Sequence, residues 1–383
     1  MSGLWIQHGY GKGTKISDIR DSALAAGVVL SPGDEGRRSL SETRSVLGRL
    51  DALLDPQTFV YSIPGGTARC HEDNGLAFSD LHWSASPAEV VNVAEKVVAT
   101  NRELDIPRVV APTCLQRDFR DVWTPLSLQL ARATLAAADR PVLASLVIDE
   151  GALSNWHDAT DWLDVATTLD VAGFYIVVNR GSSSYQAPWD PARLVTLLRL
   201  IYSLTELNGY EVILGYSDFE GLLGAAFGAS GHGTGWYYSL RRFSETKWQP
   251  STGGRAASPR VTSGPLMAAL RADGEADLIV RTPLAASVFP SQPVRTRLAE
   301  NPTGWSLPDS WDQHMREMGS LSRHLMSERS TATRLDTMQS LIDGALRLSA
   351  GLEPEGVLLP AAYTTRLQGF SEAVAVAREL ERV

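Results

Sequence analysis

Three carboxylates follow apolar segments of the sequence at points where a strand would end. Asp149 and Glu150 come directly after the run VLASLVI, and Asp218 comes shortly after VIL at 212–214. Two carboxyl groups held several ångströms apart can divide the roles of acid and base, or of acid and nucleophile, as in glycosidic-bond cleavage. These three side chains are therefore the candidate catalytic residues. The alternative is structural, because Asp218 stands where an N-cap for a helix at 219–227 belongs.

One segment is basic although the chain as a whole carries a formal net charge of −9. Residues 241–260 hold five basic side chains and a single acidic one, Glu245. The planar fork of arginine donates two hydrogen bonds to a phosphate at once, and tryptophan can stack on a base or a sugar. Arg241, Arg242 and Trp248 are therefore candidate contacts for a phosphate-bearing substrate. The alternative is a solvated loop whose charges balance acidic neighbours.

Further polar residues lie where they could bind the same substrate. Asn179 and Arg180 end the apolar run FYIVV, and Tyr216 follows VILG at 212–215. The glycine-rich segment HGYGKGTK at 8–15 precedes an expected helix, so its backbone amides and Lys12 could contact an anion. Its spacing matches no nucleotide-binding fingerprint. We expect Lys12, Asn179, Arg180 and Tyr216 to bind substrate, with a turn as the alternative for the glycine-rich segment.

These residues must be positioned by alternating strands and helices. The strand candidates are Leu4–Gln7, 28–30, Thr58–Ile63, 109–111, 142–148, 174–178, 212–214 and Thr234–Tyr238. Several are apolar with little alternation, as is typical of parallel strands covered on both faces. Amphipathic helices are expected between them, including one over 42–54. This order predicts a (β/α)8 TIM-type barrel, with a doubly wound open parallel sheet as the runner-up.

Two points of this assignment stay open. Leu278–Val280 is a ninth strand candidate, and if it is the eighth strand of the barrel, Leu4–Gln7 only caps the bottom. His232 precedes the last strand candidate, so a structural position at the bottom of the barrel is expected for it.

The chain divides at about residue 286, after which no strand is predicted. Residues 1–285 form the expected barrel domain, with a long loop at 67–85 and a basic flexible loop at 241–264. Residues 286–383 form the expected helical module, because apolar residues keep helical spacing over 311–325, 335–345 and 363–377. These helices could pack on the barrel or present a surface to a partner protein.

Composition narrows the classes of protein to which the chain could belong. Hydrophobic residues make up 44% and charged residues 21%, which is ordinary for a globular protein, and no apolar run is long enough to span a membrane. The first fifteen residues lack the apolar core of a signal peptide, so a cytoplasmic location is expected. Two cysteines without zinc-type spacing predict neither a disulfide framework nor a metal site, and no cofactor is predicted.

Together these features favour a barrel enzyme that acts on a phosphate-bearing substrate of the nucleotide or nucleic-acid type. The carboxylates would supply acid–base or nucleophilic catalysis at a glycosidic or N-glycosidic bond. The alternative is a non-catalytic scaffold subunit of a protein assembly, with the C-terminal helices as its interaction surface. A second alternative is a carbohydrate-processing barrel, which the ten tryptophans suggest.

Overall fold

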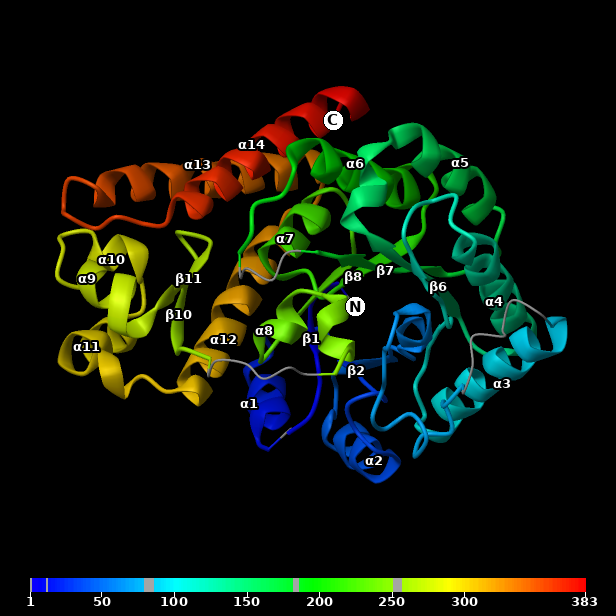
Figure 1. Ribbon diagram of the computed structural model, residues 1–383. Helices are drawn as coiled ribbons and strands as arrows, with labels where there is room; N and C mark the ends of the chain where they lie inside the picture. The colour runs from blue at the N-terminus through cyan, green and yellow to red at the C-terminus, as the bar shows by residue number, and fades with distance from the viewer. Residues whose placement is uncertain (1, 12, 79–85, 182–185, 251–256) are drawn as a thin grey trace.

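A parallel sheet curled into a barrel forms the centre of the molecule (Figure 1). The computed structural model describes residues 2–11, 13–78, 86–181, 186–250 and 257–383. The strands of the sheet are β1 (Gly3–Gln7), β2 (Gly27–Leu30), β3 (Asp51–Leu54), β4 (Val109–Val110), β5 (Leu115–Gln116), β6 (Val142–Asp149), β7 (Gly173–Asn179), β8 (Glu211–Gly215) and β9 (Gly231–Gly235). All the ladders between them are parallel.

The order of the strands curls the sheet round until its two edge strands, β3 and β4, come near each other. It runs β3-β2-β1-β9-β8-β7-β6-β4, and β5 also pairs with β6. The first strand therefore lies beside the last, and β4 and β5 together occupy one of eight strand positions. Among the described residues no ladder joins β3 to β4, so the barrel has a seam there. The predicted (β/α)8 barrel is confirmed over the open doubly wound sheet.

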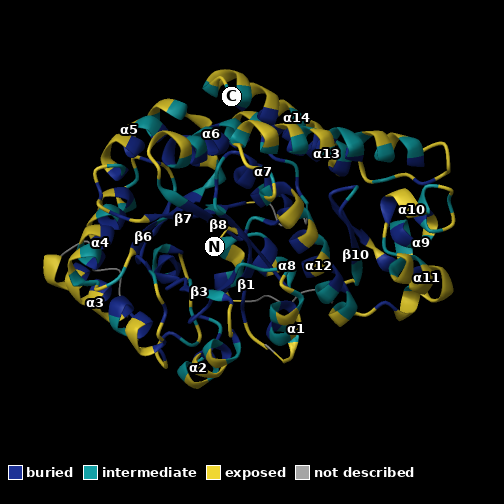
Figure 2. Ribbon diagram, turned by 180° about the vertical axis from the view of Figure 1, so that it is seen from behind, coloured by how far each residue is buried: buried dark blue, intermediate teal, exposed yellow. Residues whose placement is uncertain are grey.

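Helices alternate with the strands and cover the outside of the barrel; Figure 2 shows their outer faces exposed around buried strands. They are α1 (Lys15–Ser22), α2 (Arg37–Val46), α3 (Pro87–Glu103), α4 (Trp123–Ala137), α5 (Trp156–Ala166), α6 (Pro191–Tyr202) and α7 (Asp218–Ala226). Ser86 and Asp190 cap the first turns of α3 and α6, and both helices begin with proline, whose fixed φ suits that position.

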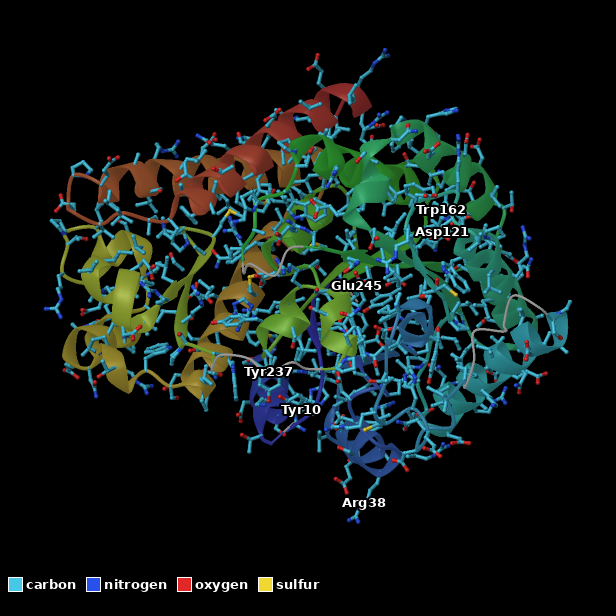
Figure 3. All side chains as sticks on the ribbon, in the orientation of Figure 1. Tyr10, Arg38, Asp121, Trp162, Tyr237 and Glu245 are labelled. Carbon is cyan, nitrogen blue, oxygen red and sulfur yellow. The ribbon has the colours of Figure 1, made fainter. Side chains whose placement is uncertain are left out.

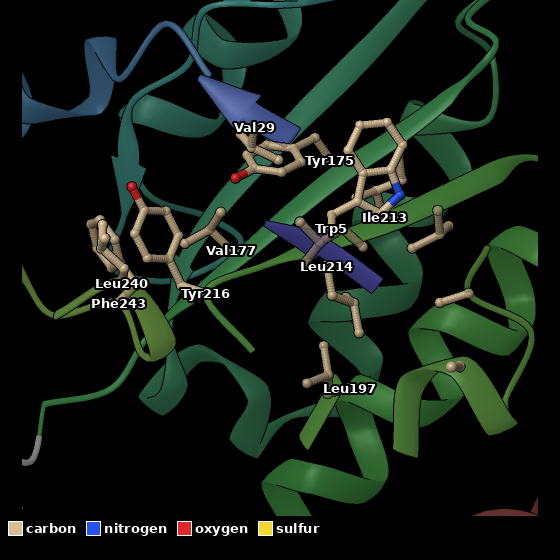
Figure 4. Packing of buried hydrophobic residues seen from close by; sticks show 14 of the residues in the cluster. Trp5, Val29, Tyr175, Val177, Leu197, Ile213, Leu214, Tyr216, Leu240 and Phe243 are labelled. Carbon is tan, nitrogen blue, oxygen red and sulfur yellow. The ribbon is translucent and has the colours of Figure 1, made fainter. Parts of the chain in front are cut away.

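Glycines on β8 and β9 make room for large aromatic side chains inside the barrel (Figure 4). A Cβ atom at Gly231 would lie 2.5 Å from Nε1 of Trp5, and one at Gly215 would lie 2.2 Å from the hydroxyl oxygen of Tyr175. Both distances are too short for any side chain. Glycine at position 231 therefore leaves the space that the Trp5 ring occupies.

Four sequence predictions about the barrel are corrected. The last strand is Gly231–Gly235 and not Thr234–Tyr238, because Tyr238–Arg241 is already helical. The third strand is Asp51–Leu54 and not Thr58–Ile63, because residues Thr58–Ser62 form the 3₁₀ helix η1. The helix expected over 42–54 ends at Val46, and Gly48 follows with a φ of 59° that breaks the helical path. Leu278–Val280 is not a strand, since Asp277–Ile279 is helical, so Leu4–Gln7 does close the barrel.

The C-terminal part is mainly helical, as predicted. The short helices α8 (Tyr238–Arg241) and α9 (Asp277–Ile279) precede it. It contains α10 (Ala285–Val288), α11 (Gln292–Glu300), α12 (Leu307–Met326), α13 (Thr331–Leu352) and α14 (Ala361–Glu381). The antiparallel hairpin of β10 (Arg260–Ser263) and β11 (Ala268–Arg271) was not predicted; its first strand falls at the end of the segment expected to be a loop. None of the helices in the described ranges is long and apolar enough to cross a membrane.

Helix α12 packs directly on the barrel, against β1, β9 and α7, and α14 packs on α6. Met315, Met318 and Leu325 of α12 are fully buried. This helix therefore covers the side of the barrel where the first and last strands meet. The division at residue 285 stays a prediction.

Candidate functional site

Polar side chains from distant strands meet inside the barrel at the carboxyl ends of the strands. The hydroxyl of Tyr175 on β7 donates to Oε1 of Gln7 on β1 at 3.2 Å and lies 3.5 Å from Oδ2 of Asp55, just after β3. Strands β1, β3 and β7 are not neighbours in the sheet, so these contacts run through the interior. Side chains alternate along a strand, which places Asn179 and its register partner Asp149 on the same interior face.

Asp55 is a carboxyl group with a strongly altered environment. It is 3% exposed, and burial raises its pKa to about 7, while the N–H of Gln57 and the charge of Lys247 act in the opposite direction. The Gln57 N–H donates to Oδ1 of Asp55 at 3.0 Å. Perturbed carboxyl groups of this kind are typical of acid–base sites.

Two tyrosine hydroxyls extend this polar cluster (Figure 4). Burial raises the pKa of both Tyr175 and Tyr216 well above its usual value, so both keep their protons. Nε2 of Gln57 donates to the Tyr216 hydroxyl at 3.2 Å. Among the described residues, Nε2 of Gln7 is a buried donor without an acceptor. A buried polar atom left unpaired is rare in proteins and marks a place for a water or a ligand group.

A short segment lies over this cluster and is fixed at both ends; we call the 3₁₀ helix η5 (Glu245–Trp248) the strap (Figure 3). Nη2 of Arg117 donates to Oε2 of Glu245 at 2.6 Å, and its Nη1 donates to Asp149 at 3.0 Å. At the other end, Lys247 donates to Oδ2 of Asp34 at 2.8 Å. The strap therefore connects the loops after β2 and β5.

Hydrogen bonds tie the strap to the predicted residues Asp149 and Asn179. The Asn179 amide donates to Oδ1 of Asp149 and accepts from the N–H of Glu245 at 3.1 Å. Trp248 is 3% exposed and meets the Phe59 ring edge-on at 5.7 Å. The structure thus brings together Asp149, Asn179, Tyr216 and Trp248 at the mouth.

Glu150 and Arg180 form a separate cluster on the opposite face of the sheet. Nε of Arg180 donates to Oε2 of Glu150 at 2.7 Å, and Nη1 lies 3.4 Å from Glu220. The guanidinium stacks 3.9 Å from the Trp189 ring and is 3% exposed. Arg242 lines a small cavity beside this cluster.

Asp218 belongs to a third network, between the barrel and α12. Its Oδ1 lies 3.2 Å from both Nε2 of His314 and the hydroxyl of Thr234, and Nδ1 of His314 lies 2.9 Å from the hydroxyl of Thr262. Burial, with a further contribution from the Arg241 charge, lowers the pKa of His314 to about 4. A neutral imidazole therefore donates its Nε2–H to the ionised Asp218, and the structure does not bring Asp218 to Asp149.

The remaining predicted residues lie near this network or outside the described ranges. Arg241 is 2% exposed and donates to the carbonyl oxygens of Gly235 and Trp236 at 2.9 and 3.2 Å. His232 is fully buried on β9, where Nε2 lies 2.9 Å from the hydroxyl of Ser322. Lys12 and residues 79–85 of the long loop lie outside the described residues.

Sequence reasoning missed Asp55, Gln57, Tyr175 and Gln7 at the centre of the mouth. Asp55 was missed because the third strand was placed too late in the chain. The available signal was DALLDP at 51–56, an apolar run followed by an acid and a proline. In the part of the chain that the structure describes, no group of three or more His, Cys, Asp or Glu side chains could hold a metal.

Comparison with known proteins gives distant structural likeness only. The sequence matches no known family and, at a significant level, no curated protein. A probable tagatose 6-phosphate kinase from Sinorhizobium meliloti aligns at 13% identity over 98% of this chain and 100% of its own, with a TM-score of 0.37. A GH3-family glycosyl hydrolase from Mycobacterium smegmatis aligns at 12% identity over 84% of this chain and 95% of its own, with a TM-score of 0.36.

Dihydrodipicolinate synthase from Oceanobacillus iheyensis aligns at 10% identity over 98% of this chain and 96% of its own, with a TM-score of 0.33. Scores this low carry no argument about this chain. Its fold rests on the pairing of its own strands, and its function has to be argued from the site.

Proposed function

We propose that this chain is an enzyme that uses carboxyl groups at the barrel mouth on a phosphate-bearing, nucleotide- or nucleic-acid-type substrate. The observation that carries the proposal is Asp55, a buried carboxyl group at the end of a barrel strand whose pKa is about 7. A proton donor or acceptor works best when its pKa lies near the working pH. Active sites of such barrels are built at this end of the strands.

Two carboxyl groups support cleavage or transfer at a glycosidic or N-glycosidic bond. In that chemistry one protonated carboxyl group protonates the leaving group, and one carboxylate acts as base or nucleophile. Asp55 fits the donor role, because it holds a proton over part of the near-neutral range. Asp149 fits the second role, since it lies on the same interior face and is oriented by Arg117 and Asn179.

The cations beside the strap support an anionic substrate. Arg117 and Lys247 pair with Glu245 and Asp34 over the mouth. A phosphate accepts the same hydrogen bonds as a carboxylate, so a phosphate-bearing substrate can exchange for these two partners. Such an exchange would release the strap and open Asp55, which is 3% exposed when the strap is in place.

The test is release of free base from a panel of nucleoside 5′-monophosphates and RNA, followed by chromatography over a range of pH. We expect Asp55→Asn to lower kcat by at least roughly 100-fold, the usual contribution of a general acid. Asp51→Asn is the matched control, because Asp51 lies on the same strand at the opposite end of the barrel.

A pH profile separates catalysis from positioning. The limb of the profile that reports Asp55 is expected near pH 7 in wild type and should be absent in Asp55→Asn. Absence of turnover on every member of the panel, or unchanged turnover by Asp55→Asn, would refute the proposal.

A second candidate is the non-catalytic scaffold. One observation favours it: Asp55 is 3% exposed, and Arg117, Arg180 and Lys247 each pair with a carboxylate. Under this alternative, Asp55→Asn would stabilise the protein without loss of any activity. A pull-down with the full chain, compared with one in which exposed residues of α13 and α14 are changed, would then identify a partner.

A further inference from the structure

A cavity of about 360 Å³ lies beside the mouth, where the segments after β1 and β9 meet α12. Its walls include Tyr10, Trp236, Tyr237, Tyr238 and Trp311. The volume falls within the range of small-molecule sites in proteins. For the glycine-rich segment 8–15 the sequence left open an anion contact or a plain turn. This segment supplies Tyr10 to the wall, and Lys15 at its end lies beside the aromatic rings.

The aromatic walls are arranged as platforms for a flat ring. Tyr10 is 55% exposed, yet its ring stacks on that of Tyr237 at 5.1 Å with an angle of 18° between the planes (Figure 3). Trp311 meets Tyr237 edge-on at 4.9 Å. Open aromatic faces of this kind stack on bases and other flat rings whatever their sequence or substituents.

Two cationic side chains give the cavity its charge: Arg241 lines it, and Lys15 lies beside its aromatic rings. Nζ of Lys15 lies 4.6 Å from the ring centre of Trp311 and 5.1 Å from that of Tyr237, and it donates to the Tyr237 hydroxyl at 3.2 Å. Among the described residues, none that lines the cavity is acidic and no carboxylate forms a salt bridge with Lys15, which also donates to the carbonyl oxygen of Gly11 at 2.6 Å. Burial alone lowers the pKa of Lys15.

This arrangement favours an anionic ligand over a cationic one. Three aromatic rings around an ammonium form the kind of cage that holds cationic ligands, but here the chain's own lysine occupies it. A second cation would be repelled by Lys15. An anion would instead gain a charge-assisted hydrogen bond from a donor that has no carboxylate partner.

We propose that this cavity binds a flat-ringed anion of the purine nucleoside monophosphate type, with its ring against Tyr10 and Trp311 and its charge toward Lys15. The inference goes beyond the proposed function, because Arg117 and Lys247 do not line this cavity, which would bind a nucleotide whether or not the mouth acts on one. Binding can be measured without turnover.

The experiment measures binding to the full chain by calorimetry and tryptophan fluorescence, with three probes. AMP carries both the ring and the charge, adenosine only the ring, and ribose 5-phosphate only the charge. We expect AMP to bind at least about tenfold more tightly than either fragment, and its affinity to fall with added salt because the ion pair is partly exposed. The affinity for adenosine should not depend on salt.

Two variants separate the contribution of the ring to binding affinity from that of the charge. Tyr10→Ala should weaken AMP and adenosine alike, by roughly five- to hundredfold, as expected for loss of one stacking platform. Lys15→Met should lower the affinity for AMP toward that for adenosine and leave adenosine unchanged. Lys96→Met is the matched control, because Lys96 lies 5.3 Å from the Phe78 ring at a site away from the cavity, and it should change nothing.

The outcomes separate this inference from the proposed function. No binding of AMP at millimolar concentration, or equal affinities in wild type and both cavity variants, would overturn the inference even if base release is observed. Binding with the expected pattern but no base release on any substrate would leave the cavity assigned and refute the proposed chemistry. Asp55→Asn should bind AMP as the wild type does.

Discussion

Asp55 makes the stability of this protein depend on pH in an unusual direction. Burial raises its pKa from 3.8 to about 7, so between these values the folded chain binds the proton more tightly than the unfolded chain. The resulting stabilisation is complete below pH 4 and is lost as the pH rises through 7. The interval from 3.8 to about 7 corresponds to roughly 4 kcal/mol.

We expect Asp55→Asn to remove this loss of stability with rising pH. Because asparagine is neutral at every pH, the variant's free energy of unfolding should exceed that of wild type by up to roughly 4 kcal/mol at pH 8, and by only roughly 2 kcal/mol at pH 5. Urea unfolding at both pH values measures the difference. Asp51→Asn should not reproduce this pH dependence. A variant less stable than wild type by the same amount at both pH values would contradict it.

Among the elements, the strap is held by side chains rather than by its own length. It has four residues, and ion pairs at Glu245 and Lys247 hold it over the mouth. We expect Arg117→Met to loosen it locally, so that amides 245–248 exchange hydrogen faster. The side chain of Arg117 is 39% exposed, so the free energy of unfolding should change by no more than about 1 kcal/mol.

Hydrogen exchange followed by mass spectrometry measures this loosening. Arg120→Met is the matched control, because Arg120 lies three residues away and pairs with Asp158 and Asp161 instead of the strap. Equal exchange of 245–248 in wild type and Arg117→Met would show that aromatic packing of Trp248 alone holds the strap.

Elements with one strong pattern were predictable from the sequence, and pairings across the chain were not. Long apolar runs gave β6 and β7, and with them Asp149 and Asn179. The third strand was lost because Leu50, Leu53 and Leu54 continue the helical spacing of α2, while TFVYSI alternates like a strand. Tyr175 looks like any core residue of an apolar strand. The partners Arg117 and Glu245 are 128 residues apart, and only the closed barrel brings them together.

At the scale of the whole molecule, buried histidines join the barrel to the C-terminal helices. His232 of β9 bonds Ser322 of α12, and His314 of α12 bonds Thr262 of β10 and Asp218. Burial lowers the pKa of both imidazoles to about 4, and that of His71 beside the mouth likewise. The junction is therefore built from neutral imidazoles, and protonation has to break it.

This predicts that acid separates or unfolds the protein. Between pH 6.5 and 4 the unfolded chain binds more protons at these histidines than the folded chain, so their contribution to stability is present above pH 6.5 and is lost as the pH falls toward 4. Each imidazole can contribute roughly 3 kcal/mol over this interval. Three of them outweigh the opposite dependence of Asp55, and the free energy of unfolding should therefore decrease from pH 7 to pH 4.5.

His314→Gln tests the origin of this dependence. The variant loses hydrogen bonds and should be less stable at pH 7, but its free energy of unfolding should fall less steeply with acid, because one of the three titrating groups is gone. His324→Gln is the matched control on the same helix, since His324 is exposed and should leave the slope as in wild type. Urea unfolding at several pH values between 4.5 and 7 gives both slopes. If His314→Gln kept the slope of wild type, the acid sensitivity would have to come from groups other than the junction, and the neutral imidazole bonded to Asp218 would be the wrong protonation state.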